Sequence, residues 1–303
     1  MPETCEAGAR TSPILPRVST PPFLELPTGV TPRAIDTARG AFQGLEAGDP
    51  SAPTALLVPG FTGSKEDFVA ILAPLAGAGY HVVTYDQRGQ YETAGPPGPE
   101  GWTLDGFAAD VLAVADATTS EPVHLLGHSF GGLVARAAVL ADPSRFRSLV
   151  LMSSGPAAIS DERSALLEQM AAGLDLFGLA VVWTVIRERE VAAGWQPPED
   201  PRVDAFLHQR FLANDPAGLA AMARILATAQ DRTDELRKVA LPTLVAFGAE
   251  DDAWSPKIQS ETASRLGADT VSFPEAAHSP AAESPGATAS ELVAFWERVA
   301  GAG

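Results

Sequence analysis

The sequence Gly-His-Ser-Phe-Gly at residues 127–131 decides the fold. An apolar run at 123–127 leads into its serine, and a run with helical periodicity at 130–141 follows it. A serine on such a sharp strand-to-helix turn adopts a strained backbone that raises its hydroxyl above the sheet. The two flanking glycines leave room for neighbouring chains, and the N-terminus of the following helix favours a developing negative charge. The motif therefore predicts a nucleophile elbow with Ser129 as the nucleophile.

Strands and helices alternate on both sides of this turn. Short apolar runs bounded by turn residues predict buried strands, and apolar residues spaced three and four apart predict amphipathic helices. The predicted strands are 54–58, 81–85, 123–127, 148–152, 242–247 and 270–273, and the predicted helices follow Ser64 and Thr103 and cover 130–141, 256–266 and 290–299. This alternation is typical of an α/β fold with a mostly parallel central sheet flanked by helices.

The pattern changes at two places along the chain. Residues 1–32 contain seven prolines, which favours an extended Pro-rich arm over a helix. Residues 156–236 show only helical periodicity, which indicates an inserted all-helical cap between core segments 33–155 and 237–303. Large apolar residues of the insertion either pack it internally or line a pocket beneath it: Met170, Leu174, Phe177, Val181, Trp183, Trp195, Phe206, Phe211 and Met222.

A serine hydroxyl needs a base to become a strong nucleophile, and the chain contains five histidines. His81 and His124 lie within predicted strands, and His208 lies in the helical insertion. The side chain of His128, next to the serine, is expected to point away from the site. His278 follows a predicted strand, at the sheet edge where parallel sheets place their sites. We therefore predict that His278 is the base.

The base needs an acid, and the oxyanion formed from the attacked carbonyl needs N–H donors. Asp251 and Asp252 both follow a predicted strand, and both fit the role of the acid by position. The backbone N–H of Phe130, directly after the serine, is one expected donor. The N–H of Phe61, in the glycine-rich loop after the first core strand, is the other.

Five motifs, in this order, resemble the α/β-hydrolase superfamily, in its common serine-nucleophile group with a helical cap. PGFTGS at 59–64 resembles that group's HGFTGS oxyanion loop, and YDQRG at 85–89 resembles its DxRG loop. GHSFGG at 127–132 resembles its elbow, GAED at 248–251 its GxxD acid loop, and AHSP at 277–280 its GHSP motif. The resemblance implies an esterase- or lipase-like enzyme.

The resemblance extends over nearly the whole chain after the arm and is weakest in the insertion. It favours Asp251 over Asp252 as the acid, and Ser129 argues against haloalkane dehalogenase and epoxide hydrolase relatives, which use aspartate there. Two positions depart from the group's pattern. Pro59 replaces the usual His, which removes a side chain that can brace the oxyanion loop, and Ala277 replaces the usual Gly. We expect the backbone donor of the oxyanion loop to survive this change.

Composition limits the partners of the protein. The 303 residues carry a net charge of −17, and such a surface repels nucleic-acid phosphates and anionic membranes. The single cysteine, Cys5, cannot form an internal disulfide, and the first residues lack the apolar core of a signal peptide. The longest apolar run, 176–186, is shorter than the roughly 20 residues that span a bilayer. We expect a soluble, cytoplasmic protein with a small-molecule substrate and no nucleic-acid or membrane partner.

The leading hypothesis is hydrolysis of a carboxylic ester of a small, apolar substrate through an acyl-enzyme intermediate. Lactonase, thioesterase, C–C hydrolase, aminopeptidase and perhydrolase activities use the same groups and remain open. A non-catalytic ligand-binding protein on the same scaffold is a second class of function. A metal hydrolase is a third, but the histidines are scattered and lack zinc-ligand spacing. Without a phosphate-binding or dinucleotide fingerprint we expect no cofactor and no metal.

Overall fold

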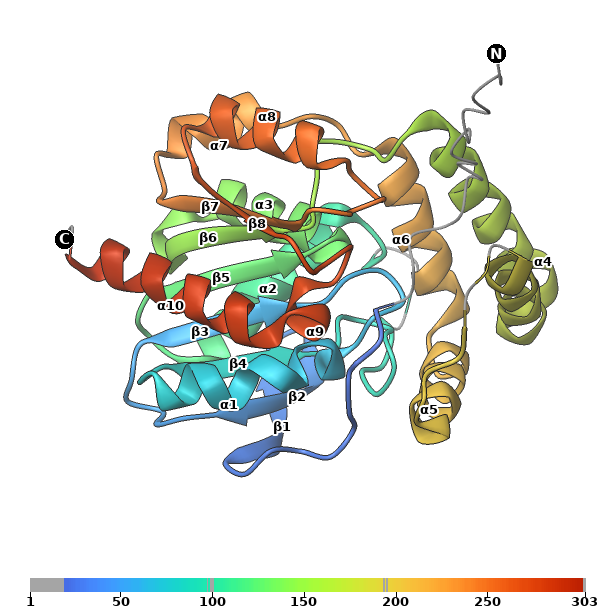
Figure 1. The fold of residues 1–303 in the computed structure, drawn as a ribbon, viewed down its shortest axis with the longest axis horizontal. Helices are drawn as coiled ribbons and strands as arrows, with labels where there is room; N and C mark the ends of the chain where they lie inside the picture. Colours follow the sequence, from blue (N-terminus) through green and yellow to red (C-terminus); the bar gives the residue numbers. More distant parts are fainter. Residues whose placement is uncertain (1–18, 97, 99–100, 193, 195, 302–303) are drawn as a thin grey trace, which may run out of the picture.

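The computed structural model describes residues 19–301 apart from 97, 99–100, 193 and 195 (Figure 1). Most of the predicted arm, including Cys5, lies outside the described residues, as does Trp195, one of the candidate pocket residues. The described part of the predicted arm is 19–32: residues 19–29 contain no helix or strand, but residues 30–32 already belong to the first strand, which begins at Val30. The division of the chain into arm, core and cap segments stays a prediction.

An eight-stranded sheet forms the centre of the fold, in the order β1-β2-β4-β3-β5-β6-β7-β8. Its strands are β1 (Val30–Thr37), β2 (Gly40–Ala47), β3 (Thr54–Val58), β4 (His81–Tyr85), β5 (Val123–His128), β6 (Phe146–Met152), β7 (Thr243–Gly248) and β8 (Asp269–Phe273). Strands β3 to β8 pair in parallel, whereas the β1–β2 hairpin joins β4 in antiparallel orientation. The predicted α/β class with a mostly parallel sheet is confirmed.

The sequence pattern does not predict the β1–β2 hairpin. Pro32 lies within β1, and a proline argues against a strand unless the strand lies at an edge, as β1 does. Gly44 in β2 weakens the strand pattern further, but a Cβ there would lie 2.6 Å from the carbonyl oxygen of Thr84. Apolar anchors such as Ile35 and Phe42 are too widely spaced to give a clear alternating pattern.

Helices cover both faces of the sheet because strand residues alternate between two apolar surfaces. In β3, Leu57 belongs to the core beneath α1 and α10, whereas Leu56 belongs to the core beneath α2 and α3. The helices around the sheet are α1 (Val69–Gly77), α2 (Leu104–Thr118), α3 (Phe130–Ala141), α7 (Thr233–Val239), α8 (Pro256–Leu266) and α10 (Pro285–Gly301), with the short segments η1 (Lys65–Phe68), η3 (Pro143–Arg145) and α9 (Pro280–Glu283).

Three helices lie beyond the carboxyl ends of the parallel strands, at the right of Figure 1. They are α4 (Asp161–Ala192), α5 (Pro201–Leu212) and α6 (Pro216–Thr228). Asp200 and Asp215 cap α5 and α6 by accepting hydrogen bonds from N–H groups of the first turn, and a proline follows each cap. The predicted helical cap over an α/β core is therefore present.

Helix α4 is long and apolar enough, by length and composition, to be a candidate membrane span, with a mean hydropathy of 1.6 over 18 residues. The longest uninterrupted apolar run, 176–186, covers only part of this helix and therefore does not reveal it. About a third of that window is buried inside the protein. Gly178, at φ 75° and ψ 179°, breaks the helix into two segments, 161–177 and 179–192. Each segment is shorter than the roughly 20 residues that a bilayer requires.

Candidate active site

Ser129 lies at the turn between β5 and α3 with φ 55° and ψ −119°, a strained backbone conformation for a residue with a side chain. The flanking glycines are required by close backbone contacts. A Cβ at Gly127 would lie 2.2 Å from the carbonyl oxygen of Gly131, and a Cβ at Gly131 would lie 2.4 Å from that of Val58. The sequence therefore forces this turn, and it holds the serine hydroxyl at the carboxyl edge of the sheet.

The side chains of Ser129, His278 and Asp251 form one hydrogen-bonded series. His278 Nε2 lies 2.9 Å from Ser129 Oγ, and His278 Nδ1 lies 3.0 Å from Asp251 Oδ1. All three residues are at least 95% buried. Since a carboxylate only accepts, Nδ1 carries the imidazole hydrogen, and the bare Nε2 accepts from the serine hydroxyl. The geometry is that of a nucleophile, a base and an orienting acid.

Electrostatics favour a basic imidazole at this position. Burial lowers the pKa of His278, but the hydrogen bond and negative charge of Asp251 outweigh it, and the net shift is upward. Burial raises the pKa of Asp251, but its hydrogen bonds to His278, to Gln259 and to the N–H of Ala253 outweigh burial and lower it. Gln259 Nε2 donates to Asp251 Oδ2 at 2.8 Å, so both carboxylate oxygens are held. Asp251 therefore stays ionised beside the ring.

Asp252 turns to a different partner. Its carboxylate lies 2.9 Å from the guanidinium of Arg163 on α4, and its backbone carbonyl accepts a second hydrogen bond from the same side chain. The Asp252 side chain is 40% exposed, in contrast to the fully buried side chain of Asp251. The structure thus brings Asp251, and not Asp252, to the imidazole.

The loop after β3 carries the predicted donor Phe61. Gln87 Nε2 donates to the carbonyl of Pro59, and Gln90 Nε2 donates to the carbonyl of Gly60, both at 2.8 Å. Both carboxamides are buried. The N–H of Gly63 also bonds the Gly60 carbonyl, at 3.2 Å, whereas the N–H of Phe61 bonds no acceptor among the described residues and can bind an anion. The two glutamines thus brace the loop at the position where the proline replaces histidine.

A buried ion pair fixes the far end of this loop. Asp86 accepts from the backbone N–H of Lys65 and from its ammonium, both at 2.8 Å. Burial raises the pKa of Asp86 to about 7, against the opposing charge of Lys65. The Lys65 ammonium also bonds Glu92 at 2.7 Å. These contacts tie η1, directly after the oxyanion loop, to the loop that follows β4.

The other predicted donor is the N–H of Phe130, at the first position of α3, where helix geometry leaves the N–H without an acceptor in its own helix. The side chain of Phe130 points into the core, edge-on to Phe107 with ring centroids 5.5 Å apart. Phe130 directly follows Ser129, and Phe61, from the loop after β3, lines the same pocket as Ser129. This arrangement allows a carbonyl oxygen bound at the serine to meet two backbone donors.

The prediction that the His128 side chain points away from the site is wrong, because strand alternation does not hold at the sharp turn. Its ring lies 5.1 Å from that of His278 between centroids, and its Nε2 lies 2.8 Å from the carbonyl oxygen of His278. Nε2 therefore carries the hydrogen. Burial, aided by the positive charge of His278, lowers the pKa of His128 to about 4, so the ring is neutral. His128 supports the loop of the predicted base.

The remaining histidines lie away from the serine. His81 contacts Thr54 and Glu46, His124 bonds Ser148, and His208 stacks on Trp183 at the surface of the helical cap. Among the described residues, no group of three or more His, Cys, Asp or Glu side chains is arranged to hold a metal ion.

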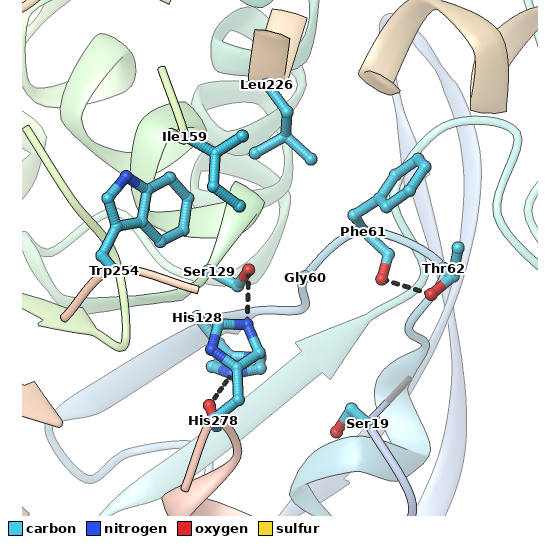
Figure 2. A pocket seen from close by; sticks show the side chains of 10 residues that line it. All are labelled: Ser19, Gly60, Phe61, Thr62, His128, Ser129, Ile159, Leu226, Trp254 and His278. Carbon is cyan, nitrogen blue, oxygen red and sulfur yellow. Dashed lines mark hydrogen bonds between the residues drawn. The ribbon is translucent and has the colours of Figure 1, made fainter. Parts of the chain in front are cut away.

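A small pocket opens at the serine. Figure 2 shows its apolar residues Ile159, Leu226 and Trp254 on one side of the Ser129–His278 pair, and Ser19 on the other. Its lining residues are Ser19, Gly60, Phe61, Thr62, His128, Ser129, Ile159, Leu226, Trp254 and His278. The small size and mixed walls suit a compact substrate.

None of the described apolar residues that were candidates for the pocket lines it. Met170, Leu174, Trp183, Phe211 and Met222 are buried, and Met222 contacts Gln90 of the loop after β4. Phe177 and Val181, on either side of the break in α4, are exposed. Phe206 is half-buried against Arg210 and Tyr91. The cap instead contributes Ile159 and Leu226, and the acid loop contributes Trp254. Sequence periodicity could not single these out, because it marks apolar faces but not which face meets the serine.

Comparisons with known proteins identify the family and the fold of this chain. A model of the α/β hydrolase fold family matches residues 53–285. The chain is 33% identical over 222 residues to "Putative carbamate hydrolase RutD" of Variovorax paradoxus, covering 69% of this chain and 77% of that protein. It is 30% identical over 173 residues to 3-oxoadipate enol-lactonase 1 of Acinetobacter baylyi, covering 57% and 62%.

Solved structures give the same picture of the fold. The enol-lactonase from Burkholderia xenovorans superposes with a TM-score of 0.73 over 88% of this chain and 100% of that one, at 22% identity. At that identity the likeness concerns the fold alone.

Proposed function

The chain belongs to the α/β-hydrolase family, and we propose that it cleaves a carboxylic ester of a small substrate through an acyl-enzyme at Ser129. The observation that carries the proposal is the hydrogen-bonded series from Ser129 Oγ through His278 to Asp251. A ligand-binding protein has no need of a strained serine with a base and a buried acid behind it.

The proposed reaction has two halves. Ser129 Oγ attacks the ester carbon while its proton passes to His278 Nε2, and Asp251 stabilises the imidazolium that forms. The N–H groups of Phe61 and Phe130 bind the oxyanion of the tetrahedral intermediate. When the intermediate collapses, its bond to the alcohol oxygen breaks, and that oxygen takes the proton from His278. Water, deprotonated by the same imidazole, then attacks the acyl-enzyme and releases the acid and the serine.

A serine-reactive fluorophosphonate probe tests this proposal directly. We expect the native protein to be labelled at Ser129 and the Ser129→Ala variant not to be labelled, with parallel loss of p-nitrophenyl acetate hydrolysis. Ser290, exposed on α10, provides a matched control, since Ser290→Ala should be labelled like the native protein. A native protein that neither reacts with the probe nor cleaves the ester would favour a binding function instead.

A lactone is a second candidate substrate, because a lactone is a cyclic ester and a 30% identical relative is named as an enol-lactonase. The same serine would open the ring, and the alcohol product would remain attached to the acid. Initial rates on δ-valerolactone and on its open-chain analogue methyl pentanoate separate the two. A larger kcat/KM for the lactone would move the assignment from open-chain esters to lactones.

The glutamines of the oxyanion loop provide a further prediction. We expect Gln90→Met to lower kcat for p-nitrophenyl acetate about 10- to 100-fold with little change in KM, because the Gly60 carbonyl loses its buried side-chain donor and keeps only the longer bond from the N–H of Gly63. Gln209→Met, at an exposed position of α5, is the matched control. A kcat within twofold of the native value, in a variant that melts at the native temperature, would remove Gln90 from this positioning role.

A further inference from the structure

The described end of the arm reaches the active site. Ser19 lines the pocket together with residues of the oxyanion loop, the elbow and the loop of the predicted base. It is 6% exposed, and its Oγ is buried without a hydrogen-bond partner among the described residues. A buried hydroxyl with no partner costs free energy, so its presence in the wall of this pocket needs a physical reason.

Arg210 of α5 holds this segment in place. The guanidinium is completely buried and donates to the Ser19 carbonyl at 2.7 Å and to Asp67 Oδ1 at 2.7 Å. It also contacts Ser64 Oγ at 3.3 Å and lies over the ring of Phe206. One buried cation therefore ties the arm to η1, next to the oxyanion loop, and to the cap. The carbonyl of Ser19 is consequently held in place, whereas the hydroxyl of Ser19 bonds nothing among the described residues.

The pocket places this hydroxyl opposite an apolar wall. Ile159, Leu226 and Trp254 lie on one side of the Ser129–His278 pair, and Ser19 lies on the other (Figure 2). The hydroxyl of Thr62, the other lining residue with a hydroxyl besides Ser129, already donates to the Phe61 carbonyl at 2.6 Å. Of the described hydroxyls that line this pocket, apart from that of Ser129, the Ser19 hydroxyl is therefore the one free to hydrogen-bond a substrate.

We propose that Ser19 is a substrate-binding residue whose hydroxyl hydrogen-bonds an oxygen of the substrate near the scissile ester bond. The substrate class is accordingly a small ester that carries a hydroxyl group on its acid or its alcohol part, with an apolar part against Trp254. The apolar wall alone would accept any short aliphatic ester. A site built to bond a substrate hydroxyl discriminates more strongly against the analogue that lacks it. This inference rests on the proposed esterase function.

Two pairs of nearly isosteric esters test the role of Ser19. One pair differs in the alcohol, 2-hydroxyethyl acetate against propyl acetate, and the other in the acid, methyl 3-hydroxypropanoate against methyl butanoate. We expect the native protein to favour the hydroxylated member of at least one pair, and Ser19→Ala to lower that kcat/KM ratio about tenfold. A structural role would change the rates of both members of a pair equally and leave the ratio unmoved. Ser290→Ala is the control and should keep the native ratio.

Thermal unfolding provides the second readout. Because the Ser19 hydroxyl has no partner among the residues that the structure describes, Ser19→Ala should melt at or above the native temperature. Unchanged ratios for both pairs in Ser19→Ala, or a fall in its melting temperature of several degrees, would overturn the assignment while leaving the esterase proposal intact. If the native protein cleaves none of the four esters and no p-nitrophenyl acetate, the esterase proposal is overturned, and the role of Ser19 falls with it.

Discussion

Replacing His278 by alanine should lower kcat for p-nitrophenyl acetate by about 1,000-fold or more. Without the imidazole, the proton of Ser129 Oγ has no acceptor at 2.9 Å, and neither the leaving alcohol nor the attacking water has a proton-transfer partner. Removal of one member of such a triad typically costs most of the advantage that the whole triad provides. The residual rate should be that of oxyanion binding alone.

His208→Ala is the matched control, because His208 is an exposed histidine stacked on Trp183 in the cap. It should retain nearly native turnover. The fold of both variants can be checked by their melting temperatures and circular dichroism. A loss of less than tenfold in His278→Ala, with the fold intact, would mean that another group is the base.

The second large effect concerns the acid. Asp251→Asn should lower kcat by roughly 1,000- to 10,000-fold, because an amide can donate to Nδ1 and so stabilise the wrong imidazole tautomer. It also removes the charge that stabilises the imidazolium. The carboxylate is buried and held by Gln259, so water cannot easily replace it. Stopped assays at saturating p-nitrophenyl acetate measure this loss.

The pH dependence provides an independent signature of Asp251. The pKa of His278 lies above its ordinary value because Asp251 outweighs burial, and only the neutral ring is a base. Activity should therefore be full at pH values above that raised pKa and should fall as the pH drops through it. Asp251→Asn removes the largest raising contribution to the pKa of His278 and leaves the smaller ones of Asp252 and Glu283, so the acid limb of kcat/KM should move to lower pH.

Asp252→Asn separates the two neighbouring acids. Asp252 is partly exposed and paired with Arg163, so its loss should change kcat less than about threefold and leave the acid limb near its native position. If Asp252→Asn were the more damaging of the two variants, Asp251 would not be the acid.

Much of the fold could be predicted from local sequence signals. The helix expected at 256–266 is α8, and Thr103 caps α2 with its side chain. These segments follow local rules of capping, periodicity and turn residues. The β1–β2 hairpin could not be found in this way, because the proline and glycines within it weaken the local strand pattern and are explained only by contacts with, or position relative to, other strands. In particular, Gly44 is explained by its approach to β4, which is distant in sequence.

The candidate site was partly predictable for the same reason. Residues within short motifs, such as Ser129, His278 and Asp251, meet in the structure, and their catalytic roles stay predictions. The walls of the pocket were not predictable, since Ser19 and Trp254 carry no motif and reach the serine only through the packing of the chain. Ser19 in particular depends on Arg210, a contact that spans 191 residues.

The buried guanidinium of Arg210 also constrains how caps can be exchanged among such enzymes. A chimaera that receives a foreign cap without an arginine at this place would leave the carboxylate of Asp67 buried beside no cation, a change that typically destabilises by about 3–5 kcal/mol. The incoming cap must therefore bring its own cation, or Asp67 must be neutralised together with it. Substitutions in the cap, the arm and the oxyanion loop would then have to change together in evolution and not independently.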